Sequence, residues 1–202
     1  MTSILHIDCS ARTSESVTRV LSGRVVKSLR TADAGATVTR RDLTTMDLPH
    51  VDGTVAEALF IDDEALDDQH KRALALSDLL TDELLWADTV VAGIPMYNFG
   101  VPSTFKAWID LVVRPRKTFR KIAKGQLEGL CQGKRLFACT AGHGQFNGTP
   151  IDHLRPYLEK VFGFIGFDEV VFFDAERMAW GPEEKQQSIA AASTAIDAHF
   201  AF

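Results

Sequence analysis

The sequence predicts an α/β fold with a five-stranded parallel sheet, in the order 2-1-3-4-5, and helices on both faces. First, short apolar runs of strand length alternate with longer segments whose apolar residues recur at helical spacing. Such alternation is typical of a parallel sheet whose crossover helices cover both faces. Second, the 202 residues are 46% hydrophobic, which suits one domain, residues 1–202, with its own core. Third, five strands in a chain of this length favour the order 2-1-3-4-5 of doubly wound sheets.

The expected elements alternate along the chain. Strands are predicted at residues 3–9, 36–43, 89–94, 134–140 and 169–173. Helices are predicted at residues 17–29, 69–86, 103–113, 151–164 and 182–200. The second strand alternates apolar and charged residues, which favours a position at the edge of the sheet. We expect residues 44–68 to form an irregular loop, solvated or at an interface, and the basic residues 114–124 to be solvated surface.

Composition limits the classes of partner. The chain has 22 Lys and Arg against 27 Asp and Glu, a net charge of −5, whereas nucleic-acid-binding proteins usually carry a basic face. No apolar run approaches the roughly 20 residues that span a bilayer, and no basic leader precedes the first strand. We therefore expect neither a nucleic-acid nor a membrane partner.

The cysteines and histidines give no sign of a metal site. Cys9, Cys131 and Cys139 form no CxxC pair, and their odd number favours a reducing, cytoplasmic compartment. Cys9 and Cys139 lie in apolar strand-like runs, so we expect buried, inert thiols there. The six histidines are scattered without the spacing of metal ligands. If the protein is an enzyme, a bound cofactor is expected to carry the reactivity.

Hydroxyl residues crowd the loop between the first strand and the first helix. They are Ser10, Thr13, Ser14 and Ser16. Free N–H groups and the helix dipole favour an anion at such a position, so the loop predicts a phosphate site. It matches neither GxGxxG nor GxxxxGK[ST], which argues against a tightly held dinucleotide and excludes a P-loop. The alternative is simple helix capping by Ser14 or Ser16, but capping needs only one hydroxyl.

Two further loops lie at the carboxyl edge of the predicted sheet, where ligands bind in open α/β folds. Residues 93–103 carry an aromatic ring, an amide and a thioether between two prolines, which suits a flat aromatic ligand with polar edges. The alternative is an ordinary loop with a buried Tyr and Phe. Residues 141–145 contain two glycines, which allow close approach to a ligand, and His143, either a cation near that ligand or an exposed loop histidine.

Four segments share one resemblance: Pro95-Met96-Tyr97-Asn98-Phe99, the loop with Ser10 and Ser14-Glu15-Ser16, Thr118-Phe119-Arg120, and Gly163-Phe164-Ile165-Gly166. Together they resemble the FMN-dependent NADH-azoreductase family, whose members also act as NAD(P)H:quinone reductases. The resemblance runs from the first strand to Ala179-Trp180-Gly181-Pro182. It implies a cytoplasmic, flavodoxin-like homodimer with non-covalent FMN at the interface. It further implies ping-pong transfer of two electrons from NADH or NADPH to small aromatic acceptors, namely quinones and azo compounds.

The resemblance also implies site residues. Ser10, Ser14, Glu15 and Ser16 are expected to hold the FMN phosphate, Pro95, Met96, Tyr97, Asn98 and Phe99 to line the isoalloxazine ring, and Thr140, Ala141, Gly142, His143 and Gly144 to meet its pyrimidine side. Phe119, Lys121 and Phe164 are the expected substrate contacts, with Phe164 reaching the partner's site. The family tends to have Ser-Arg-Gly-Gly at 141–144, and some members place a Tyr at 121. These departures leave the preferred acceptor open. The choice between NADH and NADPH is open as well.

Two other classes compete with this interpretation. A flavodoxin-type FMN electron carrier would share the phosphate loop without a substrate site of its own, but such carriers are usually more acidic than −5. A receiver-type signalling domain would share the strand order and use an acidic cluster. The third predicted strand ends Gly93-Ile94-Pro95, however, without an Asp that could be phosphorylated.

Overall fold

Five parallel strands form the central sheet in the order β2-β1-β3-β6-β7. The computed structural model describes residues 1–201, apart from the side chain of Asp63; the expected domain ends at Phe202, outside the described residues. The sheet strands are β1 (Ser3–Asp8), β2 (Thr37–Asp42), β3 (Thr89–Pro95), β6 (Arg135–Ala141) and β7 (Glu169–Ala175). When only the five strands of this sheet are numbered along the chain, their order is the predicted 2-1-3-4-5. As expected, β2 lies at the edge.

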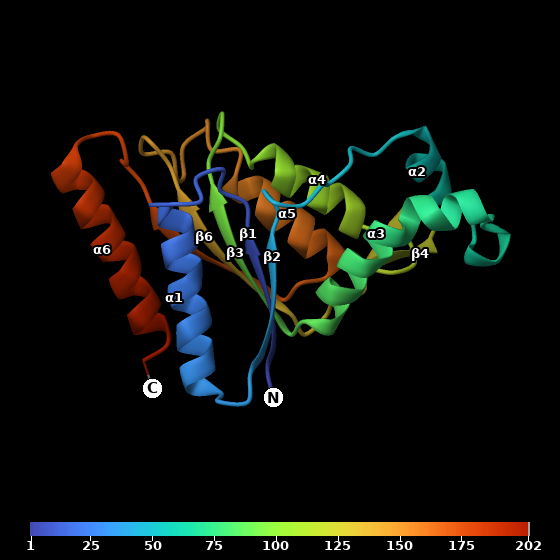
Figure 1. The fold of residues 1–202 in the computed structure, drawn as a ribbon, viewed down its shortest axis with the longest axis horizontal. Helices are drawn as coiled ribbons and strands as arrows, with labels where there is room; N and C mark the ends of the chain where they lie inside the picture. The colour runs from blue at the N-terminus through green and yellow to red at the C-terminus, as the bar shows by residue number, and fades with distance from the viewer. Residues whose placement is uncertain (202) are drawn as a thin grey trace.

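Helices cover the sheet on both faces (Figure 1). One face is covered by α1 (Val17–Ala32) and α6 (Pro182–His199), and the other by α3 (Asp68–Trp86), α4 (Ser103–Val112) and α5 (Arg155–Ile165). All seven residues of the central strand β3 are buried, because both of its faces pack against helices. Each fully buried Leu, Ile or Phe in these two layers contributes roughly 1.5–3 kcal/mol.

One close contact brings the first helix against the centre of the sheet. A Cβ atom added to Gly93 of β3 would lie 2.9 Å from the Thr18 carbonyl oxygen and 3.0 Å from Asp8 Oδ1. Glycine is therefore required where α1 crosses β3. The close approach places the amino end of α1 beside the loop that follows β3, so two of the predicted ligand loops are neighbours.

Residues 44–68 are more ordered than we predicted. They contain the helix α2 (Gly53–Ala58) and the short 3-10 helix η1 (Asp63–Ala65). The Asp52 side chain caps α2 by accepting the Val55 N–H at 2.9 Å. Val55 and Leu59 then pack against Leu74 of α3. The capping signal is visible in the sequence, but this small core exists only once α3 is in place.

Residues 114–124 are not simply solvated surface, as we predicted. Arg114 and Thr118 are buried, and β4 (Phe119–Ala123) pairs antiparallel with β5 (Gln126–Gly129). The Arg114 guanidinium donates to Ser77 Oγ at 2.6 Å and pairs with Asp78 at 3.1 Å, which offsets the cost of burying its charge. The sequence did not reveal this hairpin, because apolar and polar residues do not alternate regularly along β4 and β5 and neither strand has a continuous apolar face.

The fourth predicted helix starts later than expected. It was predicted from residue 151, but α5 begins at Arg155. Before it, the buried Asp152 side chain accepts the N–H groups of Leu154 and Arg155, both at 3.1 Å. These bonds hold residues 151–154 in a turn, and the helix starts where they end.

Candidate functional site

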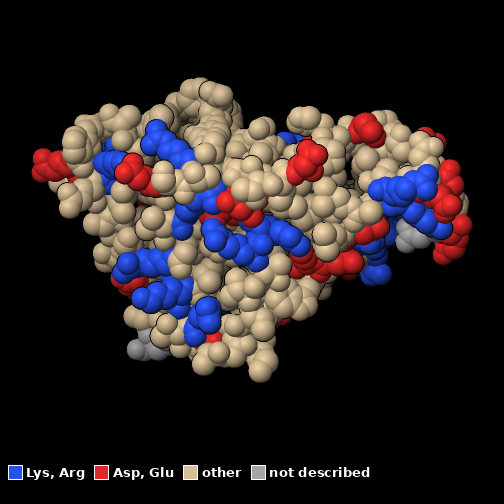
Figure 2. Space-filling model, viewed as in Figure 1, with Lys and Arg blue, Asp and Glu red and all other residues tan. Residues whose placement is uncertain are grey.

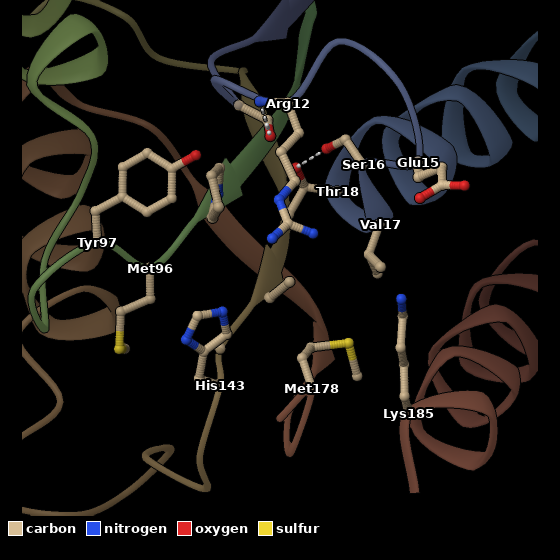
Figure 3. A pocket seen from close by; sticks show the side chains of 14 residues that line it. Arg12, Glu15, Ser16, Val17, Thr18, Met96, Tyr97, His143, Met178 and Lys185 are labelled. Carbon is tan, nitrogen blue, oxygen red and sulfur yellow. Dashed lines mark hydrogen bonds between the residues drawn. The ribbon is translucent and has the colours of Figure 1, made fainter. Parts of the chain in front are cut away.

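A cavity of about 180 Å³ opens at the carboxyl ends of β1, β3 and β6. Its walls are the three predicted loops, the first turn of α1, and the segment that joins β7 to α6 (Figure 3). The lining residues are Ser10, Arg12, Glu15, Ser16, Val17, Thr18, Pro95, Met96, Tyr97, Ala141, Gly142, His143, Met178 and Lys185. The cavity is smaller than the roughly 300–1,000 Å³ of typical ligand sites, so one chain encloses only part of a site for a larger ligand.

Ser16 stands at the N-cap of α1, yet its hydroxyl does not cap the helix. It lies 3.3 Å from Thr18 Oγ1 and lines the cavity with it. The N–H groups of the first helical turn have no partner within the helix, and here the N-cap side chain does not take one of them. The capping explanation of the serines is therefore wrong for Ser16, and its hydroxyl and the N–H groups of the helix terminus are groups of the kind that bind anions.

Two cations point into the same cavity. The guanidinium of Arg12 extends across its middle, and the ammonium of Lys185 reaches toward it from α6 (Figure 3). Within residues 1–201, neither charged group has a hydrogen-bond or ion-pair partner, although most other Arg residues are paired. In Figure 3 the Glu15 carboxylate lies beyond Ser16, away from the Arg12 guanidinium. The part of the cavity between Arg12 and Lys185 therefore favours an anionic ligand.

The hydroxyl of Tyr97 joins the two loops at the rim of the cavity. It accepts the N–H of Ala11 at 3.1 Å, while Ser10 Oγ accepts the N–H of Arg12 at 3.3 Å. The Tyr97 ring is 39% exposed, so it is not the buried core tyrosine of the alternative interpretation. It presents an aromatic surface beside Met96, at the end of the cavity away from Lys185 (Figure 3).

Residues 97–100 form a tight turn at the tip of the loop after β3. The N–H of Tyr97 bonds the Gly100 carbonyl at 3.0 Å, and the reverse bond is 3.1 Å. Asn98 and Phe99 have positive φ angles of 49° and 70°, which cost about 1–3 kcal/mol for non-glycine residues. Among the described residues their two N–H groups have no partner. The Phe99 ring packs edge-on against Phe146, 5.9 Å between centroids, which holds the turn.

The loop after β6 differs from our prediction in its backbone. We expected its glycines to donate N–H groups to a ligand, but the Gly142 N–H bonds the Ala175 carbonyl at 3.0 Å. A Cβ on Gly142 would lie 3.2 Å from the Phe146 ring and one on Gly144 2.8 Å, so a larger residue at either position would displace that ring. His143 remains exposed and points its imidazole into the cavity (Figure 3).

Thr140 is held away from the cavity. Its hydroxyl donates to Asp174 Oδ1 at 2.6 Å, and Arg155 pairs with the other carboxylate oxygen at 2.5 Å. Burial raises the pKa of Asp174 despite these two bonds, because desolvation outweighs them. Thr140 therefore belongs to a structural network between β6, β7 and α5.

The structure gathers most of the predicted cofactor residues around one cavity. Ser10, Glu15, Ser16, Pro95, Met96, Tyr97, Ala141, Gly142 and His143 line it, whereas Ser14, Asn98, Phe99, Thr140 and Gly144 do not. Five further residues line the cavity that the sequence did not predict: Arg12, Val17, Thr18, Met178 and Lys185. Arg12 lies within the predicted loop, where only the hydroxyls were considered. Met178 and Lys185 follow β7, the last strand. Because the carboxyl end of β7 lies at the same edge of the sheet as the cavity, its position in the sequence could have predicted these two residues.

The three predicted substrate residues lie elsewhere in the chain. The Phe119 ring of β4 packs on the Phe164 ring of α5, with 4.8 Å between centroids, and Lys121 is exposed on β4. None of them lines the cavity, and β4 lies on the side of the molecule opposite α6 (Figure 1). In a single chain they therefore do not meet a ligand in the cavity.

The remaining groups with catalytic potential are inert or scattered. Cys9 and Cys139 are buried as predicted, and burial raises the pKa of both thiols well above the usual range. Cys131 is also buried, with a pKa raised to about 11. Within residues 1–201 no three His, Cys, Asp or Glu side chains are placed to hold a metal ion. No helix in this range combines the length and apolar character needed to cross a bilayer.

Residues 2–200 match a family described by its flavodoxin-like fold. A Nostoc protein, named as an FMN-dependent NADH:quinone oxidoreductase, is 41% identical over 97% of both chains. A protein of the same name from Burkholderia thailandensis is 39% identical over 98% of this chain and 100% of its own. The chain belongs to the flavodoxin-like family that includes these FMN-dependent NADH:quinone oxidoreductases.

Solved structures agree with the fold. An azoreductase from Bacillus anthracis superimposes with a TM-score of 0.90 over 99% of both chains, at 24% identity. A second, titled an FMN-dependent NADH-azoreductase in complex with FMN, gives 0.84 over 98% of this chain and 99% of its own, at 20% identity. At these identities the likeness concerns the fold, and it confirms the flavodoxin-like arrangement of this chain.

Proposed function

We propose that this chain is an FMN-dependent oxidoreductase that takes two electrons from NADH or NADPH and passes them to quinones and azo compounds. The observation that carries the proposal is the cavity itself. Hydroxyls and two cations without a partner among the described residues lie at one end, and aromatic and thioether side chains lie at the other. FMN has the same polarity, a phosphate at one end and a flat ring system at the other. The names of the relatives support the same assignment.

The residues present fit FMN. Arg12, Lys185 and the hydroxyls of Ser10 and Ser16 would hold the phosphate, at the amino end of α1. Met96, Tyr97 and Met178 would pack against the ring system, and the free N–H groups of Asn98 and Phe99 lie on the loop beside it. When bound, FMN supplies the hydride-accepting group that the protein itself lacks.

The chain's own part in the reaction is then binding and orientation. Polar N–H and hydroxyl donors fixed in the loops would stabilise negative charge without reorganising, since their positions are set by the fold. A donor and an acceptor that use the same face of the cofactor in turn would give ping-pong kinetics. No cavity-lining carboxylate besides Glu15 is present among the described residues, so protons would come from water or the cofactor.

We further propose a cytoplasmic homodimer in which a second copy completes each site. The cavity of one chain is about 180 Å³ and open, while Phe119, Lys121 and Phe164 lie outside it. The β4–β5 hairpin, which carries Phe119 and Lys121, leaves Ile122 57% exposed and Leu127 52% exposed. A partner would cover these two apolar side chains. Three free, buried cysteines suit a reducing compartment. Light scattering of the purified protein tests the dimer.

The function is tested with purified protein and added FMN under anaerobic conditions. NADH or NADPH is expected to bleach the flavin absorbance, and a benzoquinone or an azo dye to restore it, with parallel double-reciprocal plots in the steady state. Protein that takes up no FMN would contradict the proposal. Protein that binds FMN but is not reduced by either nucleotide would instead be an electron carrier of the flavodoxin type.

A further inference from the structure

One arginine holds the phosphate loop from behind without lining the cavity. Arg19 is the third residue of α1, and its side chain is 12% exposed. Its Nη2 donates to the Ser10 carbonyl at 2.8 Å, and its Nε donates to the Arg12 carbonyl at 3.1 Å. Both carbonyl oxygens are thereby turned toward the body of α1 and away from the open site.

The guanidinium is itself fixed by an acid on the edge strand. Nη1 and Nη2 of Arg19 form a two-pronged pair with Asp42 at 2.5 and 2.9 Å. Asp42 also accepts the N–H and hydroxyl of Thr44, at 3.1 and 2.7 Å, and the buried Asp8 lies 3.7 Å behind Arg19. A planar guanidinium bonded at two points cannot rotate. The Ser10 and Arg12 carbonyl oxygens therefore accept hydrogen bonds from N–H groups whose positions are fixed.

Charged side chains of both signs interleave on this face of the molecule, over α1 and β2 (Figure 2). Two of the ion pairs formed by these elements are Arg19–Asp42 and the pair of Arg40 with the buried Asp8, at 2.9 Å. Arg19 differs from its neighbours because it alone among these joins the edge strand to the phosphate loop. Arg24, five residues further along α1, pairs with Asp197 of α6 at 2.8 Å and touches neither loop.

We propose that Arg19 and Asp42 form a positioning pair that sets the backbone of residues 10–12 for binding of a phosphate monoester. The inference rests on the proposed function. Carbonyl oxygens that faced the site would repel a dianion, whereas the pair directs both to Arg19 and leaves hydroxyls and the Arg12 side chain on the ligand side. Neither Arg19 nor Asp42 lines the cavity, and among the described residues the only cavity loop that Arg19 bonds is the one with Ser10 and Arg12, so the pair is expected to affect binding of the phosphate and not of the flavin ring.

The test compares FMN with riboflavin, which lacks the phosphate, by fluorescence titration of the flavin-free protein. Asp42→Asn removes the charge that orients Arg19, and Arg19→Lys keeps the charge but cannot reach both carbonyls. Each is expected to weaken FMN binding about tenfold while changing riboflavin binding less than about threefold. Asp197→Asn, which removes the partner of Arg24 on the same helix as Arg19, is the matched control and is expected to change neither.

Hydrogen exchange of the flavin-free protein gives a second readout that does not depend on any ligand. The amides of Ala11 and Arg12 are expected to exchange faster in Asp42→Asn than in wild type or Asp197→Asn. Equal weakening of FMN and riboflavin, or unchanged FMN binding in both variants, would overturn the positioning role. Wild-type protein that binds neither flavin would instead refute the proposed function.

Discussion

The two ends of the cavity differ in how their residues are held. At the polar end, Ser10, Arg12 and Ser16 belong to a loop fixed from behind by the Arg19–Asp42 pair, which spans distant parts of the chain. At the apolar end, the loop with Tyr97 closes on itself through two backbone bonds, accepts hydrogen bonds from the Ala11 and His153 N–H groups, and packs by one ring contact. The polar end thus depends on ion pairing between distant residues, and the apolar end on a local turn held by neutral hydrogen bonds and ring packing.

This difference predicts separable mutant effects. Changes at the polar end should alter the response to a phosphate, and changes at the apolar end should alter binding of the ring with or without the phosphate. Comparing FMN with riboflavin therefore assigns a variant to one end. The predictions below run from the largest expected effect to the smallest.

Removing both cavity cations should have the largest effect. In Arg12→Gln with Lys185→Gln, FMN is expected to bind at least about 100-fold more weakly, because two charge-assisted bonds, each worth roughly 1.5–3 kcal/mol, are lost in a partly exposed site. Riboflavin binding should change by less than about threefold. Fluorescence titration measures both. Lys27→Gln with Lys160→Gln, at exposed positions outside the cavity, is the charge-matched control. Equal losses for the two flavins would mean that these cations do not meet the phosphate.

Acid should weaken the support of the polar end. The bonds from Arg19 and Thr44 lower the pKa of Asp42 from 3.8 to about 2, against the opposing effect of burial. A carboxyl with a lowered pKa in the folded state stabilises the protein above its unfolded pKa and loses that stabilisation as the pH falls toward the folded value. The contribution of about 2 kcal/mol should therefore disappear between about pH 4 and pH 2.

Chemical unfolding of wild type and Asp42→Asn across this range checks the acid prediction. At pH 7 the variant should be less stable by about 2 kcal/mol, and the two unfolding free energies should converge near pH 2. Other carboxyls also titrate here, so the difference between the proteins is the informative quantity. A constant difference down to pH 2 would show that the effect of Asp42 is not ionic.

Changing the ring at the apolar end should affect both flavins. Tyr97→Leu removes the aromatic surface and the hydroxyl that accepts the Ala11 N–H. We expect riboflavin binding to weaken roughly tenfold from the lost ring contact, and FMN binding at least as much, because the lost hydrogen bond also holds Ala11 of the loop beside the phosphate. Phe60→Leu, an exposed aromatic outside the cavity, is the control. A loss confined to FMN would place Tyr97 at the phosphate instead.

The smallest effects should distinguish the serines. Ser16 is buried and lines the cavity, whereas Ser14 is exposed and does not. Ser16→Ala is expected to weaken FMN binding about threefold to tenfold, the effect of one hydrogen bond, and Ser14→Ala by less than about twofold. Titration of the two variants side by side compares them. If Ser14→Ala had the larger effect, the loop would have to rearrange around the phosphate.

The sequence predicted the part of the site that follows from the order of strands and loops along the chain. Each loop that follows a parallel strand must lie at the carboxyl edge, so Ser10, Ser16 and Met96 were expected at one site before the structure was known. Arg12 and Lys185 were missed because a lone cation in a loop or an early helical turn usually lies in solvent. Only the folded chain brings both to one cavity, where they become candidates to bind one anion.

By itself, the sequence determined the order of the sheet, the burial of Cys9 and Cys139, and the position of three loops at one edge of the sheet, because strand and helix periodicity and chain connectivity decide them. The tertiary structure decided three things that depend on residues distant in the chain. It turned Arg114 into a buried ion-paired group, used the Gly142 N–H for β7, and joined Arg19 to Asp42 behind the phosphate loop. Hydrogen bonds and charge pairs between separate elements have no periodic signal, so only the folded chain shows which partners meet.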